Sequence, residues 1–191
     1  MVAGAILPVA IHKNKLYFLF GREGPLDETP GWADFGGGTE NGEDPYKTAL
    51  REGGEELTGF LGDDTDIAKL IKLGGGFYKF VHGTYTIHIF LIHYDENLVK
   101  YYNRNHDFLW KRMDNTYLSE TKLFEKVEID WFTVQDMKRR IKEYRSFYQE
   151  IVGELLEEMP KIDAFLRKKN KNFMKKTVKK SKKSKKTVKN R

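Results

Sequence analysis

Residues 44–57 read DPYKTALREGGEEL, and this stretch decides how the rest of the chain is interpreted. Its Ala, Leu, Arg, Glu and Lys residues favour a helix, and Pro45 stands where a first helical turn accepts proline. Two glycines, Gly53 and Gly54, interrupt it, although each costs an exposed helix interior about 0.8–1.0 kcal/mol relative to Ala. We predict a helix over residues 44–57 whose weak positions have a reason other than helix stability.

Three glutamates share one face of this predicted helix. At about 100° per residue, Glu55 and Glu56 fall on either side of Glu52, within roughly 60° of it. Like charges spaced i, i+4 destabilise a helix unless a counter-charge is present. Arg51 can neutralise one carboxylate, and a hard cation such as Mg²⁺ can satisfy the remaining oxygens. Because Mg²⁺ sites commonly act on phosphates, the pattern indicates phosphate chemistry, with a solvated acidic helix face as the alternative.

The spacing around these glutamates resembles the Nudix box. The pattern G-x5-E-x7-R-E-x2-E-E is carried by Gly37, Glu43, Arg51, Glu52, Glu55 and Glu56. The lead-in from Trp32 to Gly37 is similar to the W-x2-P-G-G entry of that family, with Phe35 in place of proline. The end of the box departs from the pattern, because Gly53 stands at an apolar position and Thr58 where the family has glycine.

The resemblance implies an α/β fold, a Nudix-type α/β/α sandwich around a mixed β-sheet. It implies a hydrolase that uses Mg²⁺ or Mn²⁺ to cleave a pyrophosphate bond in a nucleoside diphosphate linked to another moiety, such as a nucleotide sugar or a dinucleoside polyphosphate. The implied metal ligands are Glu52, Glu55, Glu56 and the Gly37 carbonyl. The implied catalytic residues are Glu55, Glu56, Arg51, which orients the glutamates, and Glu43, its partner. Water would attack one phosphorus, with Glu55 also able to relay a proton.

Four residues outside the box are candidates for substrate binding. Arg22 is placed like the phosphate-contacting arginine of the family, and an ordinary loop charge is the alternative. Glu125 and Glu128 are candidates for an additional base or ligand, against the alternative of surface glutamates. Trp110 lies among aromatic and basic residues that can stack a base and hold phosphates, unless they pack a small core of their own.

Apolar patterning predicts the remaining elements. The expected strands are 3–10 and 16–20 as a hairpin, 31–35, 77–81 and 84–93 as a second hairpin, and 126–132. Apolar residues from Met137 to Met159 recur every three or four positions, which predicts one amphipathic helix that Pro160 ends or kinks. On the helix of residues 44–57, Gly53 falls in the stripe that faces the sheet, and we predict that a large side chain fills the space it leaves.

The net charge of +6 hides two different parts. Residues 167–191 carry twelve Lys and two Arg without an acidic residue, whereas residues 1–166 carry 20 basic and 28 acidic ones. We predict a Nudix domain over residues 1–166, with an insertion or long loop near 95–124, and a disordered Lys-rich tail over 167–191. The segment from Lys168 to Arg191 can attract RNA or another polyanion. An mRNA 5′-cap pyrophosphohydrolase is therefore one alternative function, and a non-catalytic nucleotide-binding module is another.

The composition excludes several other classes of site. The chain has no Cys, so disulfides, thiolate zinc sites and Cys nucleophiles are excluded. No apolar run reaches the roughly 18 residues of a membrane span, and the N-terminal residues lack the basic region of a signal peptide. We expect an intracellular, cytoplasmic protein, with a nuclear location left open by the basic tail. We interpret His82, His88 and His93 as structural, because they lie on or beside strands without ligand-like partners.

Overall fold

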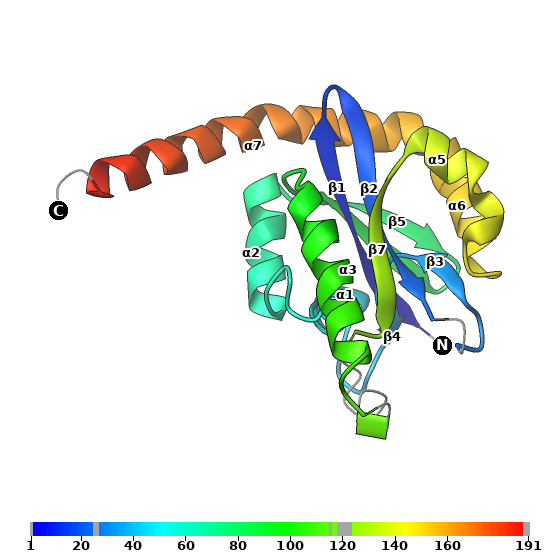
Figure 1. The fold of residues 1–191 in the computed structure, drawn as a ribbon. Helices are drawn as coiled ribbons and strands as arrows, with labels where there is room; N and C mark the ends of the chain where they lie inside the picture. Colours follow the sequence, from blue (N-terminus) through cyan, green and yellow to red (C-terminus); the bar gives the residue numbers. More distant parts are fainter. Residues whose placement is uncertain (1, 25–26, 115, 118–123, 189–191) are drawn as a thin grey trace.

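A single mixed sheet with helices on both faces forms the body of the protein (Figure 1). The computed structural model describes residues 2–24, 27–114, 116–117 and 124–188. The strands are β1 (Ala3–His12), β2 (Lys15–Glu23), β3 (Gly31–Ala33), β4 (Phe35–Gly38), β5 (Phe77–His82), β6 (Tyr85–Leu91) and β7 (Lys126–Thr133). They run in the order β3-β2-β1-β6-β5, with β4 paired to β1 and β7 to β2. The β1–β6 pair is parallel and the other pairs are antiparallel, which confirms the predicted mixed sheet and both hairpins.

Two hydrophobic cores lie on opposite faces of the sheet, because side chains alternate along each strand. On β1, Leu7 and Val9 face one core while Ile6 and Ala10 face the other. The first core is covered by α5 (Val134–Arg139), η1 (Ile141–Glu143), α6 (Tyr148–Glu157) and α7 (Met159–Val188). The second is covered by α1 (Pro45–Glu56), α2 (Asp64–Gly74) and α3 (Glu96–Trp110). This arrangement confirms the predicted α/β/α sandwich.

Helix α2 was missing from the predicted elements. Asp63 caps its N-terminus by accepting a hydrogen bond from the Asp66 amide, and Gly75 ends it at a φ of 92°. Ile67 and Ile71, one helical turn apart, are its buried contacts with the core. The sequence therefore contained an N-cap residue, an apolar stripe and a C-terminal glycine that together indicate this helix.

The prediction of a single helix between Met137 and Met159 is wrong, because the helix is interrupted in the middle of this range. The chain there forms α5, η1 and α6, and Tyr144 between the last two is extended, with a ψ of 155°. The backbone at this break binds β3 instead, since the Arg145 amide donates to the Trp32 carbonyl at 3.1 Å. The apolar spacing was correct, because Met137, Tyr144 and most of the other stripe residues are buried. Hydrogen bonds to the sheet edge replace those of a continuous helix.

The interpretation of residues 95–124 as an irregular segment is also corrected in part. Asp95 caps α3, whose Tyr102 is fully buried and donates a hydrogen bond to backbone carbonyls at 2.9 and 3.0 Å. Residues 115 and 118–123 lie outside the described residues. The first part of this segment is therefore a helix, α3, and not a loop.

Beyond residue 166 the chain continues as part of α7, which extends to Val188. Ile162, Leu166 and Phe173 of this helix are buried, so the folded body extends to residue 173. Lysine is a good helix former, and extending a helix that packing has already nucleated costs little. Figure 1 shows the later part of α7 projecting away from the sheet. Within the described residues, no helix combines the length and apolar character needed to cross a membrane.

Candidate functional site

Helix α1 is pressed closely against the sheet, and glycines make this approach possible. Asp44 caps the helix, with its Oδ1 accepting from the amides of Tyr46 and Lys47. A side chain at Gly53 would collide with the Ile6 side chain of β1. The prediction that a large side chain fills the space beside Gly53 is thus confirmed, and the residue that fills it is aliphatic.

The C-terminal end of α1 explains the departure of the box at Thr58. The helix ends at Glu56, and Thr58 itself adopts the left-handed conformation, with a φ of 51°. This region favours glycine, the residue that the family pattern has at this position. The Thr58 hydroxyl accepts a hydrogen bond from the Phe124 amide at 3.3 Å, which ties the strained position to the chain before β7.

Arg51 organises the carboxylates on the outer side of α1. Its Nε donates to Glu43 at 2.9 Å, and its Nη1 donates to Glu52 at 2.8 Å and to Glu55 at 3.2 Å. We call Glu43, Arg51, Glu52 and Glu55 the outer cluster. The structure therefore brings together four of the residues that the sequence assigned to the site. Glu55 is the most accessible of the three glutamates, with 48% of its side chain exposed.

The outer cluster carries more negative charge than its cation neutralises. Within the cluster one guanidinium faces three carboxylates, which leaves two negative charges, and a fourth carboxylate, Glu40, lies 3.9 Å from the same guanidinium. The hydrogen bond from Arg51 lowers the pKa of Glu43 to about 2, so this carboxylate stays ionised. Burial raises the pKa of Glu52, and the nearby charges of Glu55 and Glu125 raise it further. Excess negative charge of this kind favours a bound cation.

The oxygen donors of the outer cluster fit Mg²⁺ or Mn²⁺. Any side chain at Gly37 would run into the Glu52 carboxylate, so the β4 backbone and this carboxylate share one small space. Carboxylates and a backbone carbonyl are the ligands that these hard cations prefer. The residues that could hold the ion on this side are Glu52, Glu55 and the Gly37 carbonyl.

Glu56 lies on the inner side of α1 and has different partners. It is 5% exposed, its Oε2 accepts from the Gly36 amide at 2.9 Å, and its Oε1 accepts from Lys126 Nζ at 2.9 Å. Lys126 is 1% exposed and also donates to Glu23. Glu23 in turn accepts from Arg145 Nη1 at 2.7 Å. We call Glu23, Glu56, Lys126 and Arg145 the inner cluster.

Burial and mutual contacts shift the pKa values of Glu56 and Lys126 in the inner cluster. Burial raises the pKa of Glu56 to about 8, although the Lys126 ammonium opposes this shift. Burial alone would lower the pKa of Lys126, but Glu56 and Glu23 together raise it to about 12. Lys126 therefore stays protonated across the working pH range. Glu23 faces inward at an irregularity of the β2–β7 register between Arg22 and Glu23.

Lys126, Glu23 and Arg145 were missed by sequence reasoning. Lys126 begins a strand that reads KVEIDWFT, where a lysine looks like a solvent-facing residue. Glu23 becomes buried through the register change at the end of β2, which no local pattern announces. Arg145 is 122 residues from Glu23 in the chain. Only the tertiary fold brings these three together.

The candidates for substrate contact separate into three places. Arg22 and Glu128 form an ion pair of 2.7 Å and line a cavity of about 570 Å³ beside Trp32. Glu125 is close enough to the glutamates to raise the pKa of Glu52. Trp110 lies at the end of α3, where it stacks on His106 at 5.3 Å and packs against the second core.

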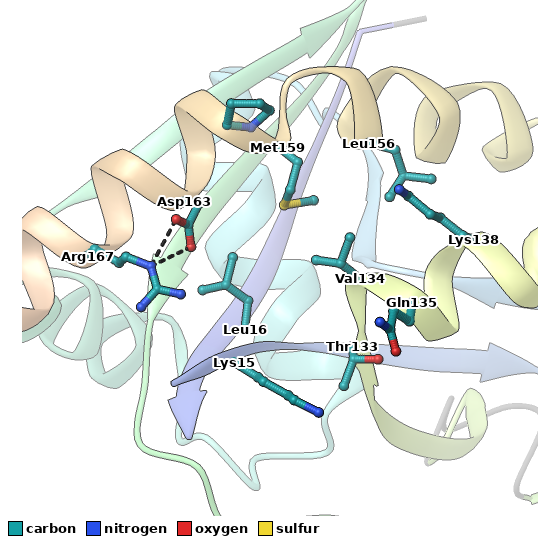
Figure 2. Close-up of a pocket in the computed structure, with 11 residues that line it drawn as sticks. Lys15, Leu16, Thr133, Val134, Gln135, Lys138, Leu156, Met159, Asp163 and Arg167 are labelled. Carbon is teal, nitrogen blue, oxygen red and sulfur yellow. Dashed lines mark hydrogen bonds and ion pairs between the residues drawn. The ribbon is translucent and has the colours of Figure 1, made fainter. Parts of the chain in front are cut away.

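Two further cavities differ in their relation to these residues. One, of about 610 Å³, lies beside the outer cluster and is lined by Glu43, Lys47, Arg51 and Glu55 among others. The other, of about 530 Å³, lies between the β1–β2 turn, α5 and α7, on the opposite face of the sheet (Figure 2). Figure 2 shows Arg167 paired with Asp163 at its rim. No member of either carboxylate cluster lines the cavity of Figure 2.

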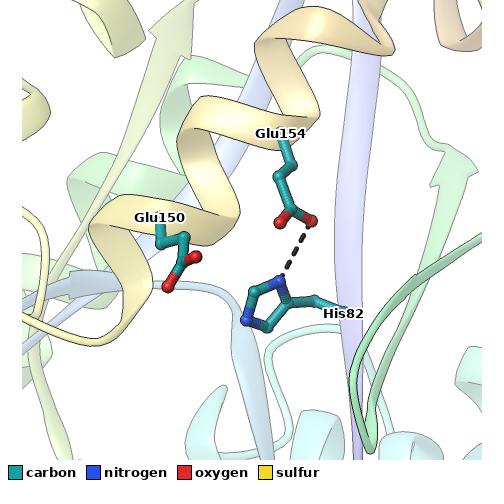
Figure 3. Close-up of side chains that lie close together, drawn as sticks. All are labelled: His82, Glu150 and Glu154. Carbon is teal, nitrogen blue, oxygen red and sulfur yellow. Dashed lines mark hydrogen bonds and ion pairs between the residues drawn. The ribbon is translucent and has the colours of Figure 1, made fainter.

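The interpretation of His82 as a residue without ligand-like partners is wrong. His82 Nδ1 lies 3.0 Å from Glu154, and Glu150 stands one turn away on α6 (Figure 3). One ligand atom from each of the three residues lies within 4.8 Å of the others. His88, by contrast, is buried and pairs with the Ala5 carbonyl at 3.1 Å, and His93 stacks on Phe173. These two contacts are structural.

Comparisons with known proteins agree with the fold described above. The structure is similar to a Nudix hydrolase from M. smegmatis, RenU, with a TM-score of 0.50 and 14% identity over 85% of this chain and 88% of that chain. It also matches an Ap4A hydrolase from C. elegans in a binary complex, with a TM-score of 0.49 and 16% identity over 86% of this chain and 98% of that chain. No family model matches the sequence, and no curated protein matches it. The chain has the Nudix fold.

Proposed function

We propose that this protein is a Mg²⁺- or Mn²⁺-dependent hydrolase that cleaves a pyrophosphate bond in a nucleoside diphosphate linked to another moiety. The observation that carries the proposal is the outer cluster, where one arginine leaves two carboxylate charges unneutralised at the edge of a cavity. A divalent cation shared with a diphosphate matches that excess charge.

The residues of the outer cluster have separate parts in this reaction. Glu52, Glu55 and the Gly37 carbonyl would hold the ion, while Arg51 keeps the two carboxylates oriented. Glu43 and the Gly38 carbonyl fix the Arg51 guanidinium by accepting from it at 2.9 and 3.3 Å. When bound, the ion supplies neutralisation of phosphate charge and a lowered pKa for water.

Hydrolysis needs a base beside the attacked phosphorus. The water oxygen bonds to one phosphorus, the bond to the bridging oxygen breaks with inversion, and the second phosphate leaves. The proton of the water passes to a carboxylate, for which we propose Glu125 or Glu55. Glu125 is within electrostatic reach of Glu52, and Glu55 is exposed to the cavity.

A substrate panel tests the proposed activity. The full chain is incubated with Mg²⁺ or Mn²⁺ and nucleotide sugars, dinucleoside polyphosphates, NADH, oxidised NTPs and capped RNA, and products are separated by chromatography. We expect turnover of at least one compound, with loss of that turnover in Glu52→Gln. The proposal fails if no compound is cleaved faster by the wild type than by Glu52→Gln. Binding without cleavage would instead support a non-catalytic nucleotide-binding module.

A cap-cleaving activity on RNA is the second candidate, and α7 favours it. The basic segment from Lys168 to Arg191 continues as a helix to Val188 and projects from the body, where it can contact a polyanion (Figure 1). Because Phe173 is buried, the matched truncation removes residues 174–191 and leaves the core intact. Unchanged cleavage of capped RNA by that truncation, at low and at raised salt, would remove the RNA candidate.

A further inference from the structure

The inner cluster has its own cations beside its carboxyl groups, without any metal ion. Lys126 lies between Glu56 and Glu23, and Arg145 pairs with Glu23 and, at 3.1 Å, with Asp27. Asp34 accepts a hydrogen bond from the Tyr85 hydroxyl at 2.6 Å and has no ion pair with this cluster among the described residues. A divalent cation added at Glu56 would lie beside the buried Lys126 ammonium, and two like charges in a buried place are costly. The outer cluster, one helical turn away, has more carboxylates than cations.

Lys126 is built into its position. Its aliphatic stem runs over Gly21 of β2, where an added Cβ would lie only 2.8 Å from Lys126 Cγ and 3.0 Å from Cδ. The Tyr102 hydroxyl lies 2.9 Å from the Glu56 carbonyl and 3.0 Å from the Lys126 carbonyl, so it ties the two backbones together. These contacts leave the ammonium group facing Glu56 and Glu23.

Both oxygens of Glu56 already accept hydrogen bonds. Oε2 is held by the Gly36 amide and Oε1 by Lys126 Nζ, each at 2.9 Å. Glu52 differs, because its contact with Arg51 is on the accessible side of the helix and its other neighbour is the Gly37 backbone. Glu55 is exposed and has no contact with the inner cluster among the described residues.

We propose that Lys126 is the permanent counter-cation of Glu56. The divalent cation, on which this inference and the proposed function both rest, is then bound on the outer side of α1 by Glu52 and Glu55. Glu56 is a positioning residue that holds the β4 backbone and Lys126 against α1. This chain therefore replaces one expected carboxylate–metal contact with a carboxylate–ammonium contact.

Mn²⁺ binding to the full-length protein tests this assignment without any substrate. Free Mn²⁺ is measured by electron paramagnetic resonance during titration of the wild type and of Glu52→Gln, Glu55→Gln and Glu56→Gln. We expect Kd to rise by about tenfold or more in the first two variants and to stay unchanged in Glu56→Gln. Glu154→Gln, next to His82, is the matched control and should bind Mn²⁺ like the wild type. An equal loss in Glu56→Gln and Glu52→Gln overturns the proposal, as does a loss confined to Glu154→Gln.

Lys126→Met supplies the reciprocal test when thermal melting shows that it folds. Removing the ammonium frees Glu56, so Mn²⁺ should bind more tightly or with an added equivalent. Unchanged binding in a folded Lys126→Met protein overturns the proposal, and Glu56→Gln decides the matter if that variant does not fold. The result can be told apart from a failure of the proposed activity. If the protein cleaves a substrate but Glu56→Gln weakens Mn²⁺ binding as much as Glu52→Gln, only this inference is rejected. If the Mn²⁺ affinities change as expected but no substrate is cleaved, only the proposed activity is rejected.

Discussion

The outer and inner sides of α1 carry similar residue types in opposite surroundings. On the outer side, Arg51 meets the three carboxylates of its cluster and Glu40 at the edge of a cavity, and its side chain is 23% exposed. On the inner side, Lys126 meets Glu23 and Glu56 and is 1% exposed. Glu52 and Glu56 are one helical turn apart, so a helical wheel cannot tell them apart. Burial and charge balance decide that one is available to a ligand and the other is part of the structure.

The first way to break this comparison is to remove the cation on each side. Lys126→Met leaves Glu23 and Glu56 buried with one cation fewer, and we expect a loss of about 3–5 kcal/mol in the free energy of unfolding. Arg51→Met removes a partly exposed cation, and we expect a loss of about 1 kcal/mol or less. Urea unfolding at neutral pH measures both.

The stability losses of Lys126→Met and Arg51→Met decide whether the inner side of α1 is structural. Thermal melting of the double variant Lys126→Met/Glu56→Gln separates the charge of Lys126 from the packing of its aliphatic stem. If the charge causes the loss of stability, Glu56→Gln should recover part of that loss. Equal losses in Lys126→Met and Arg51→Met would contradict the distinction between a structural inner side and a functional outer side.

The second test concerns turnover on the outer side. Glu52→Gln removes one carboxylate of the outer cluster, and we expect cleavage of a substrate found in the panel to fall by about 100-fold or more, which corresponds to about 2.7 kcal/mol. The unfolding free energy should change little, because Arg51 keeps Glu43 and Glu55 as partners. Steady-state kinetics and a urea titration of the same preparation check this. Retained turnover in Glu52→Gln would remove Glu52 from the mechanism.

The outer side was largely predictable from sequence, and the inner side was not. The spacing from Gly37 to Glu55 places Arg51, Glu52 and Glu55 on a helix that local propensity and Pro45 already indicate. Lys126 and Arg145 reach Glu23 from far along the chain, and the break at Tyr144 depends on hydrogen bonds to β3. Short-range patterns determine elements and faces, whereas non-local hydrogen bonds and register changes determine which charges become buried.

The third test uses pH, because the pKa of the buried Asp34 is raised whereas the pKa of Glu43 is lowered. Asp34 is buried, and burial raises its pKa from 3.8 to about 6, although the hydrogen bond from the Tyr85 hydroxyl opposes this shift. A raised pKa in the folded state contributes stability that is fully present below the unfolded pKa and is lost as pH rises through about 6. Glu43 has a pKa lowered to about 2, so its contribution is present above 4.5 and is lost as pH falls through about 2.

Asp34→Asn should therefore be more stable than the wild type at neutral pH and similar to it near about pH 4. We expect a gain on the order of 2 kcal/mol, since one pKa unit corresponds to about 1.36 kcal/mol and the Asn amide also loses hydration. Asn keeps an oxygen to accept from Tyr85. Unfolding by urea across this range measures the effect, and a gain that is the same at both pH values would show that ionisation of Asp34 is not its source.

The smallest test contrasts the two neighbouring glycines of α1. A Cβ at Gly53 would press on the Ile6 side chain, whereas a Cβ at Gly54 would make ordinary contacts of 3.6 and 3.7 Å with the backbone of Asp63 and Asp64. Alanine at either position gains about 1 kcal/mol of helix propensity. We expect Gly54→Ala to be stabilised by about that amount, and Gly53→Ala to lose about 1 kcal/mol because overpacking outweighs the gain.

Thermal and urea unfolding of the two variants measure this difference, with Ile6→Val in the Gly53→Ala background as the control. Shortening Ile6 removes Cδ1, the nearest atom that the new methyl group would meet, but keeps Cγ1 at 2.8 Å, so part of the lost stability should return in the double variant. If Gly53→Ala is as stable as Gly54→Ala, the close approach of α1 to β1 does not require glycine. The inner side of the helix would then tolerate change as readily as the outer side, and the two glycines would share one explanation.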